Sequence, residues 1–148
     1  MAGKLRGYAH RIDIDADTGR VWRAFIEPKA LARWCAPRAH IRPRQGGSFR
    51  ASVDRVSTID AHIDVFDANR RLRLIHMEQP DLPARGATLI DDFLLEADGS
   101  GTIVRLLGSG FPDDAAWDPY FLRLRAGWER ALARLKVFLE KQMDKEAK

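Results

Sequence analysis

The sequence has a single cysteine and no long apolar run, which excludes disulfide-stabilised and helical membrane-spanning proteins. Cys35 cannot form a disulfide within the chain, and we expect it to behave as a small buried apolar residue. Apolar stretches such as Leu94-Leu95 are far shorter than the roughly 20 residues of a membrane-spanning helix. The first ten residues are basic but lack the apolar segment of a secretory signal. The sequence therefore predicts a cytoplasmic protein.

Recurring metal and phosphate motifs are also missing. Paired glycines lie between extended stretches, whereas a phosphate-binding loop would lie between a strand and a helix. Ser109, between Gly108 and Gly110, is typical of a turn and has no adjacent base. We therefore predict neither a metal site nor a cofactor. The histidines lack the spacing of metal ligands, and they are His10, His40, His62 and His76.

What the sequence does contain is enough apolar residues for one buried core. Of its 148 residues, 45% are hydrophobic, and no low-complexity stretch interrupts them. The formal net charge is +4, which could indicate an anionic partner such as nucleic acid. The arginines, however, are scattered among acidic residues, and no stacking aromatic motif accompanies them. We therefore predict one domain over residues 1–148, with a basic solvated surface and no nucleic-acid partner.

Local patterns predict a strand, two short helices and then a series of strands. Residues 8–14 alternate between apolar and polar as a half-buried strand does. Asp17 and Pro28 are signals for the starts of two short helices. Residues 40–53 predict a hairpin whose turn contains Gly46-Gly47. Further strands are expected near 59–65, 71–77, 87–97 and 102–111, with a turn at 98–101.

From about Asp118 the apolar period changes to that of a helix. Eight apolar residues between Phe121 and Leu139 fall on one stripe. The stripe needs a cover, and only the sheet offers an apolar face of that size. The sequence therefore predicts an α+β fold in which a curved antiparallel sheet of about six or seven strands encloses a long C-terminal helix. The basic residues away from the stripe are Arg123, Arg130, Arg134 and Lys141.

Several segments follow one another in an order that matches a known pattern. The first strand and helices read IDIDADTGRVWRAFIEPKALARW, the glycine hairpin reads RPRQGGSFR, and the next strand and turn read AHIDVFDANRRL. A later strand reads DGSGTIVRLLGSGFPDD, and the last helix reads GWERALARLKVFLE. Together they resemble the SRPBCC superfamily of START-related, polyketide cyclase-like and birch-pollen-allergen-like proteins, which share the helix-grip fold.

The resemblance covers about residues 8–140 and points to one branch, the homologues of the activator of heat-shock-protein ATPase. Many members carry a histidine at the position of Gly108. Any role of that imidazole therefore cannot be transferred to this chain. The superfamily includes binding, transport and cyclisation proteins, so its fold alone does not determine a function.

The resemblance implies a ligand pocket between the long helix and the concave face of the sheet. Residues whose strand or helix position faces this space are predicted to line it, and their aromatic rings suit contact with a small apolar or amphipathic molecule. The alternative is that the same side chains fill a solid core. The predicted lining consists of Trp34, Leu74, His76, Asp91, Phe93, Val104, Leu106, Trp117, Tyr120, Leu124 and Trp128.

Two polar residues of this set are candidates for catalysis. His76 shares a strand face with Leu74, where relatives often carry tryptophan, and a neutral imidazole there could orient a ligand or pass a proton. Asp91 has the parity of its apolar neighbours and should face inward, where an ionised carboxylate is costly unless it is paired. Its partner could be His76 or a basic residue such as Arg42 or Arg44. The alternatives are a core histidine bound to backbone and an aspartate that reaches water.

Three functions are compatible with these features. The first is a binding protein for a small apolar or amphipathic molecule, acting as a monomer or homodimer. The second is a cyclase-type or dehydratase-type enzyme that uses His76 and Asp91 on a ligand held against Trp34, Trp117 and Trp128. The third is a co-chaperone-like protein-interaction module. Two polar groups converging on a closed cavity would favour the enzyme, and an exposed apolar stripe outside the pocket would favour the interaction module.

Overall fold

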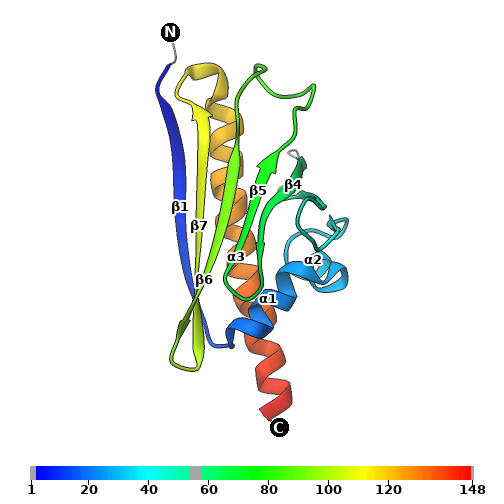
Figure 1. The fold of residues 1–148 in the computed structure, drawn as a ribbon. Helices are drawn as coiled ribbons and strands as arrows, with labels where there is room; N and C mark the ends of the chain where they lie inside the picture. Colours follow the sequence, from blue (N-terminus) through cyan, green and yellow to red (C-terminus); the bar gives the residue numbers. More distant parts are fainter. Residues whose placement is uncertain (1–2, 54–57, 148) are drawn as a thin grey trace.

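The structure, a computed structural model that describes residues 3–53 and 58–147, is a seven-stranded antiparallel sheet curved around one long helix (Figure 1). The strands are β1 (Leu5–Ile14), β2 (His40–Ile41), β3 (Ser48–Ser52), β4 (Thr58–Asp67), β5 (Arg71–His76), β6 (Ile90–Asp98) and β7 (Gly101–Pro112). Their order in the sheet is β1-β7-β6-β5-β4-β3-β2, so the first strand pairs with the last. The predicted α+β helix-grip fold is confirmed.

The helices begin where the sequence signals predicted. The carboxylate of Asp17 accepts a hydrogen bond of 2.8 Å from the backbone N–H of Arg20 and so caps α1 (Thr18–Ile26). Pro28 is the first residue of α2 (Pro28–Trp34). A short 3-10 helix, η1 (Ala115–Trp117), leads directly into α3 (Asp118–Ala147), which has 30 residues.

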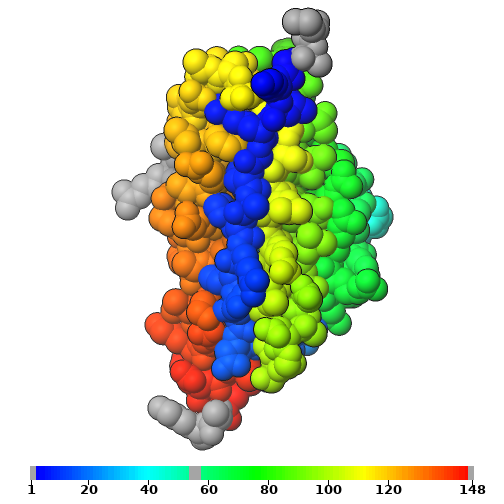
Figure 2. Space-filling view, turned by 90° about the vertical axis from the view of Figure 1, so that its left-hand side faces the viewer, coloured from blue at the N-terminus to red at the C-terminus, as the bar shows by residue number. Residues whose placement is uncertain are grey.

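The long helix α3 buries its apolar stripe against the sheet. Trp128 is fully buried, and its ring centroid lies 5.1 Å from that of Phe93 on β6. On the surface, β1 runs between α3 and β7 along the length of the molecule (Figure 2). Both short helices also contact α3. The stripe and the concave sheet face therefore form one core, while His62 on β4 lies half-buried on the opposite face.

The glycines near the end of β7 lie inside the strand, so the prediction of a turn at Ser109 is wrong. Ser109 pairs with Ile90 of β6 within the sheet. Gly110 has a φ of +88°, and any side chain there would collide with the carbonyl group of Thr88. Because glycine adopts positive φ without strain and has no side chain, it fits within the strand where another backbone approaches closely.

Candidate functional site

A cluster of three polar side chains lies inside the core, and Asp91 is at its centre. One carboxylate oxygen of Asp91 lies 2.7 Å from Nε2 of His76, and the other accepts a hydrogen bond from the hydroxyl of Tyr8. The side chain of Asp91 is 0% exposed and that of His76 is 2% exposed. Nδ1 of His76 is buried and has no hydrogen-bond partner among the residues that the structure describes. The inward direction predicted for both residues is therefore correct, and neither Arg42 nor Arg44 is the partner of Asp91.

The register of three strands explains how the cluster forms. Tyr8 on β1 lies opposite Gly108 on β7, and Gly108 lies opposite Asp91 on β6. A Cβ atom at position 108 would overlap the ring of Tyr8. Because Gly108 has no side chain, the ring can lie across β7 and bring its hydroxyl to Asp91. The residue at which this chain departs from many relatives therefore makes room for the tyrosine.

Burial and charge act together on the Tyr8 hydroxyl. Burial raises the pKa of Tyr8 well above its ordinary value, and the negative charge of Asp91 raises it further. The nearby indole N–H of Trp128 lowers the pKa of Tyr8 in part, although it forms no hydrogen bond. Tyr8 therefore stays protonated at neutral pH and donates a hydrogen bond to the carboxylate. The Tyr8 hydroxyl and Nε2 of His76 thus contact different oxygens of Asp91, and these contacts offset the cost of burying it.

Replacing Gly108 by alanine is expected to displace the Tyr8 ring and break its hydrogen bond to Asp91. Overpacking of this kind costs about 1 to 3 kcal/mol, measurable as a loss of unfolding free energy in urea. The matched control is the same substitution in a Tyr8→Leu background, where a smaller side chain without a ring lies opposite position 108. If Gly108→Ala costs as much in that background as in the wild type, the clash with Tyr8 is not its cause.

The predicted pocket lining forms one tightly packed group. Phe93 packs between Phe25 and Trp128, with its ring tilted against the first and edge-on to the second, at centroid separations of 5.0 and 5.1 Å. Trp34 donates a hydrogen bond of 2.8 Å from its indole nitrogen to the backbone carbonyl of Ala24. Trp34 and Trp117 each also border an open groove. Apart from His76 and Tyr120, every member is at most 1% exposed, and these are Trp34, Leu74, Asp91, Phe93, Val104, Leu106, Trp117, Leu124 and Trp128.

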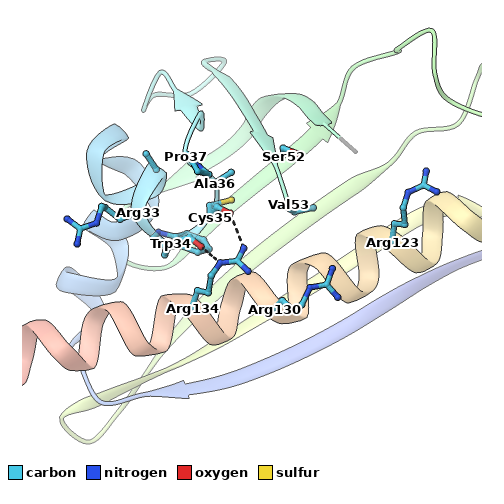
Figure 3. A pocket seen from close by; sticks show the side chains of 11 residues that line it. Arg33, Trp34, Cys35, Ala36, Pro37, Ser52, Val53, Arg123, Arg130 and Arg134 are labelled. Atoms are coloured by element: carbon cyan, nitrogen blue, oxygen red, sulfur yellow. Dashed lines mark hydrogen bonds between the residues drawn. The ribbon is translucent and has the colours of Figure 1, made fainter. Parts of the chain in front are cut away.

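An open groove of about 710 Å³ lies between the end of α2 and the middle of α3 (Figure 3). Ser52 and Val53, at the end of β3, border it on the sheet side. Val53 can approach α3 closely because Gly127 faces it, where an added Cβ would lie 3.0 Å from the carbonyl oxygen of Val53. The residues that line the groove are Ala32, Arg33, Trp34, Cys35, Ala36, Pro37, Ser52, Val53, Arg123, Arg130 and Arg134.

Arg134 fastens α3 to the C-terminal end of α2. Its Nε donates to the carbonyl oxygen of Trp34 at 2.8 Å and its Nη2 to that of Cys35 at 3.0 Å (Figure 3). These bonds satisfy two carbonyl groups that the end of a helix leaves without partners. Burial raises the pKa of the Cys35 thiol to about 12, although the charge of Arg134 lowers it slightly. The thiol is therefore protonated and unreactive at neutral pH, as the prediction of a buried apolar cysteine requires.

Sequence reasoning missed Tyr8 and the groove. The alternation of residues 8–14 includes Tyr8, but the contact of Tyr8 with Asp91 depends on a register across three strands. The arginines of α3 were noted only as lying away from the apolar stripe. Their spacing, with Arg130 seven residues after Arg123 and four before Arg134, is the signal that they share one helix face. The mid-helix Gly127 was a second signal, since a helical glycine often allows close packing.

The described part of the chain offers neither a metal centre nor a membrane helix. No three histidine, cysteine, aspartate or glutamate side chains gather there as metal ligands. None of its helices is both long and apolar enough to cross a membrane.

Solved structures share this fold over nearly the whole chain. Protein MLL2253 from Mesorhizobium loti is 21% identical, with a TM-score of 0.79 over 92% of this chain and 98% of that one. The Aha1 dimer from Colwellia psychrerythraea is 19% identical, with a TM-score of 0.77 over 91% and 96%. CalU16 from Micromonospora echinospora is 22% identical, with a TM-score of 0.71 over 95% and 80%. At these identities the likeness shows the fold.

The sequence itself matches one family model over most of its length. That model describes activator of Hsp90 ATPase homolog 1-like proteins, and it matches residues 15–140. No curated protein matches the chain. The matched range runs from the end of β1 to the last turns of α3, so it includes Asp91, His76 and the groove residues. The chain therefore belongs to the family of activator of Hsp90 ATPase homolog 1-like proteins.

Proposed function

We propose that the protein binds a small amphipathic molecule in the cytoplasm, at the groove between α2 and α3. The observation that carries this proposal is the open groove of about 710 Å³ beside Trp34. Its volume falls within the range of small-molecule sites, roughly 300 to 1,000 Å³. Ala32, Ala36, Pro37 and Val53 supply apolar contact on the α2 and β3 sides. The arginines of α3 supply the polar side that an amphipathic molecule needs.

The groove is favoured over the deeper interior because of how the interior is packed. Leu74, Phe93 and Trp128, predicted to line a central cavity, are each at most 1% exposed and contact other core side chains. A ligand among them would first have to displace rings that already fill the space. A ligand in the groove needs no such rearrangement. The groove lies between α2, the end of β3 and α3, and not over the concave sheet face to which the family resemblance points.

Nile red, an uncharged dye whose fluorescence rises in apolar surroundings, is expected to bind with micromolar affinity. Ala32→Glu should weaken this binding about tenfold, because a charged side chain would occupy the apolar wall. Ala30→Glu is the matched control. Ala30 is also a half-buried alanine of α2, but it borders a different hollow. Fluorescence titration of the two variants and the wild type measures the difference.

Two results would count against this site. The first is equal binding of Nile red by the Ala32→Glu and Ala30→Glu variants, which would place the dye elsewhere. The second is no binding of any apolar probe by the folded wild-type protein. Because Trp34 borders the groove, quenching of tryptophan fluorescence by a bound ligand should also shrink in a Trp34→Phe variant.

A second function, a cyclase-type or dehydratase-type enzyme, is favoured by one observation. His76 and Asp91 lie 2.7 Å apart, which is within reach for proton transfer. Against it, both side chains are enclosed by the core, and a substrate would need an opening near the end of β5 to reach them. We rank this function below binding for that reason. Turnover by the wild type that is lost in a folded His76→Gln variant would reverse the ranking.

A third function, a co-chaperone-like interaction module, is suggested by the family's name. The exposed large apolar residues among the described ones are scattered: Leu5 lies on β1, Leu107 on β7 and Met77 just after β5, while Leu122 and Val137 lie about 22 Å apart along α3. They form no stripe of the kind that would favour this function. The Colwellia Aha1 structure is a dimer, and we propose that this chain is a monomer or homodimer. A native mass spectrum reports both the assembly and any retained small molecule.

A further inference from the structure

We infer that the molecule held in the α2–α3 groove carries a negatively charged head group, recognised by Arg130 and Arg134. This inference rests on the proposed binding function and narrows the class of ligand to small amphipathic anions. It starts from the charge of the groove wall. Four arginines line the groove, and no acidic side chain does among the residues that the structure describes. A wall of this charge attracts an anion, whereas an uncharged ligand would gain nothing from it.

Arg134 is held in position before any ligand arrives. Its two hydrogen bonds to the carbonyl groups of Trp34 and Cys35 use Nε and one N–H of Nη2. The N–H groups of Nη1 remain for a ligand in the groove. A guanidinium fixed by its neighbours loses little side-chain freedom when it binds an anion. Arg134 is therefore one of two guanidinium groups in a preformed anion site.

Arg130 supplies the second guanidinium group of this site. It precedes Arg134 by four residues on α3, so the two side chains lie one helical turn apart on the same face, about 6 Å along the axis. Its side chain is exposed, and it has no ion-pair partner within residues 3–53 and 58–147. Two like charges at this spacing repel each other. An anion between them would relieve that repulsion and gain charge-assisted hydrogen bonds.

The apolar side of the groove restricts the anion further. Ala36, Pro37 and Val53 face the arginines across the groove. A small inorganic anion would not use these surfaces, whereas a molecule with an apolar tail would cover them. The groove therefore fits a carboxylate or phosphate monoester with an alkyl or aromatic tail. Both head groups present the oxygens that guanidinium groups bind.

The test compares ligands that share a tail and differ in the head group. Decanoate, decyl phosphate and decanol are titrated against the protein by displacement of Nile red. We expect at least one of the two anions to bind about tenfold or more tightly than decanol. Arg130→Gln should remove most of that advantage and leave decanol binding unchanged. Arg11→Gln, which removes an exposed arginine on β1 outside the groove, should have no effect. Raising the salt concentration should weaken only the anions.

The outcomes distinguish ligand binding at the groove from preference for an anionic head group. If decanol binds as tightly as both anions, or if Arg130→Gln and Arg11→Gln behave alike, the anion inference is overturned and the binding function stands. If neither the dye nor any of the three ligands binds to the folded protein, both are overturned. Preference for decanoate or for decyl phosphate supports the inference and identifies the head group.

Discussion

Replacing Asp91 by alanine is expected to lower the free energy of unfolding by about 3 to 5 kcal/mol. The substitution removes the acceptor for the Tyr8 hydroxyl and the partner of Nε2 of His76. Both groups would then be buried without a hydrogen bond, and a small cavity would remain where the carboxylate was. Denaturation in urea, followed by circular dichroism, measures the loss.

Asp92 provides a matched control for this effect. It is the next residue on β6 but faces outward, where its carboxylate pairs with Arg71 at 2.7 Å. Because that ion pair is partly solvated, Asp92→Ala should cost about 1 kcal/mol or less. Equal losses for Asp91→Ala and Asp92→Ala would mean that the buried cluster contributes nothing particular to stability.

The same experiment bears on the enzyme alternative. If Asp91→Ala leaves the protein as stable as the wild type or more stable, the fold does not need the carboxylate. A buried acid kept at a cost in stability is typical of a functional site. In that case His76 and Asp91 would become the first residues to test for catalysis. A large loss instead identifies the cluster as part of what holds β1, β6 and β5 in register.

Replacing Trp128 by alanine is expected to cost about 3 to 5 kcal/mol, the usual range for truncating a buried aromatic residue. The indole is fully buried and packs edge-on against Phe93. Its removal would separate the middle of α3 from the centre of the sheet. The midpoint of urea denaturation, compared at equal slope, reports the change in stability.

His62→Ala serves as the control for Trp128→Ala. The imidazole of His62 is half-buried on the outward face of β4, and its removal should change stability by less than about 0.5 kcal/mol. A small effect of Trp128→Ala, comparable with that of His62→Ala, would contradict the packing of α3 against β6. Retention of near-native circular dichroism in both variants would confirm that the comparison concerns folded proteins.

Local patterns were sufficient for most of the fold. The alternation around Ile12 and the helical stripe containing Trp128 each depend on residues close in sequence, so period and parity identify them. Asp17 and Pro28 act on the adjacent backbone and marked the helix starts correctly. The prediction of a turn at Ser109 was wrong because glycines are typical both of turns and of strand positions that another backbone approaches closely. Only the carbonyl of Thr88, distant in sequence, distinguishes the two.

The sequence by itself determined the class of fold and the inward direction of His76 and Asp91. It did not determine the face of every strand residue: a bulge after Ile63 pairs Val65, expected to face inward, with Arg73 and turns Phe66 toward the core. Tertiary structure decided which inward residues meet. Tyr8 reaches Asp91 only because β1 pairs with β7 in a register that sets Gly108 between them. The groove likewise exists only where α2, the end of β3 and α3 come together. Parity is a property of neighbouring residues, whereas register and helix docking are set by the packing of the whole core, which local sequence does not specify.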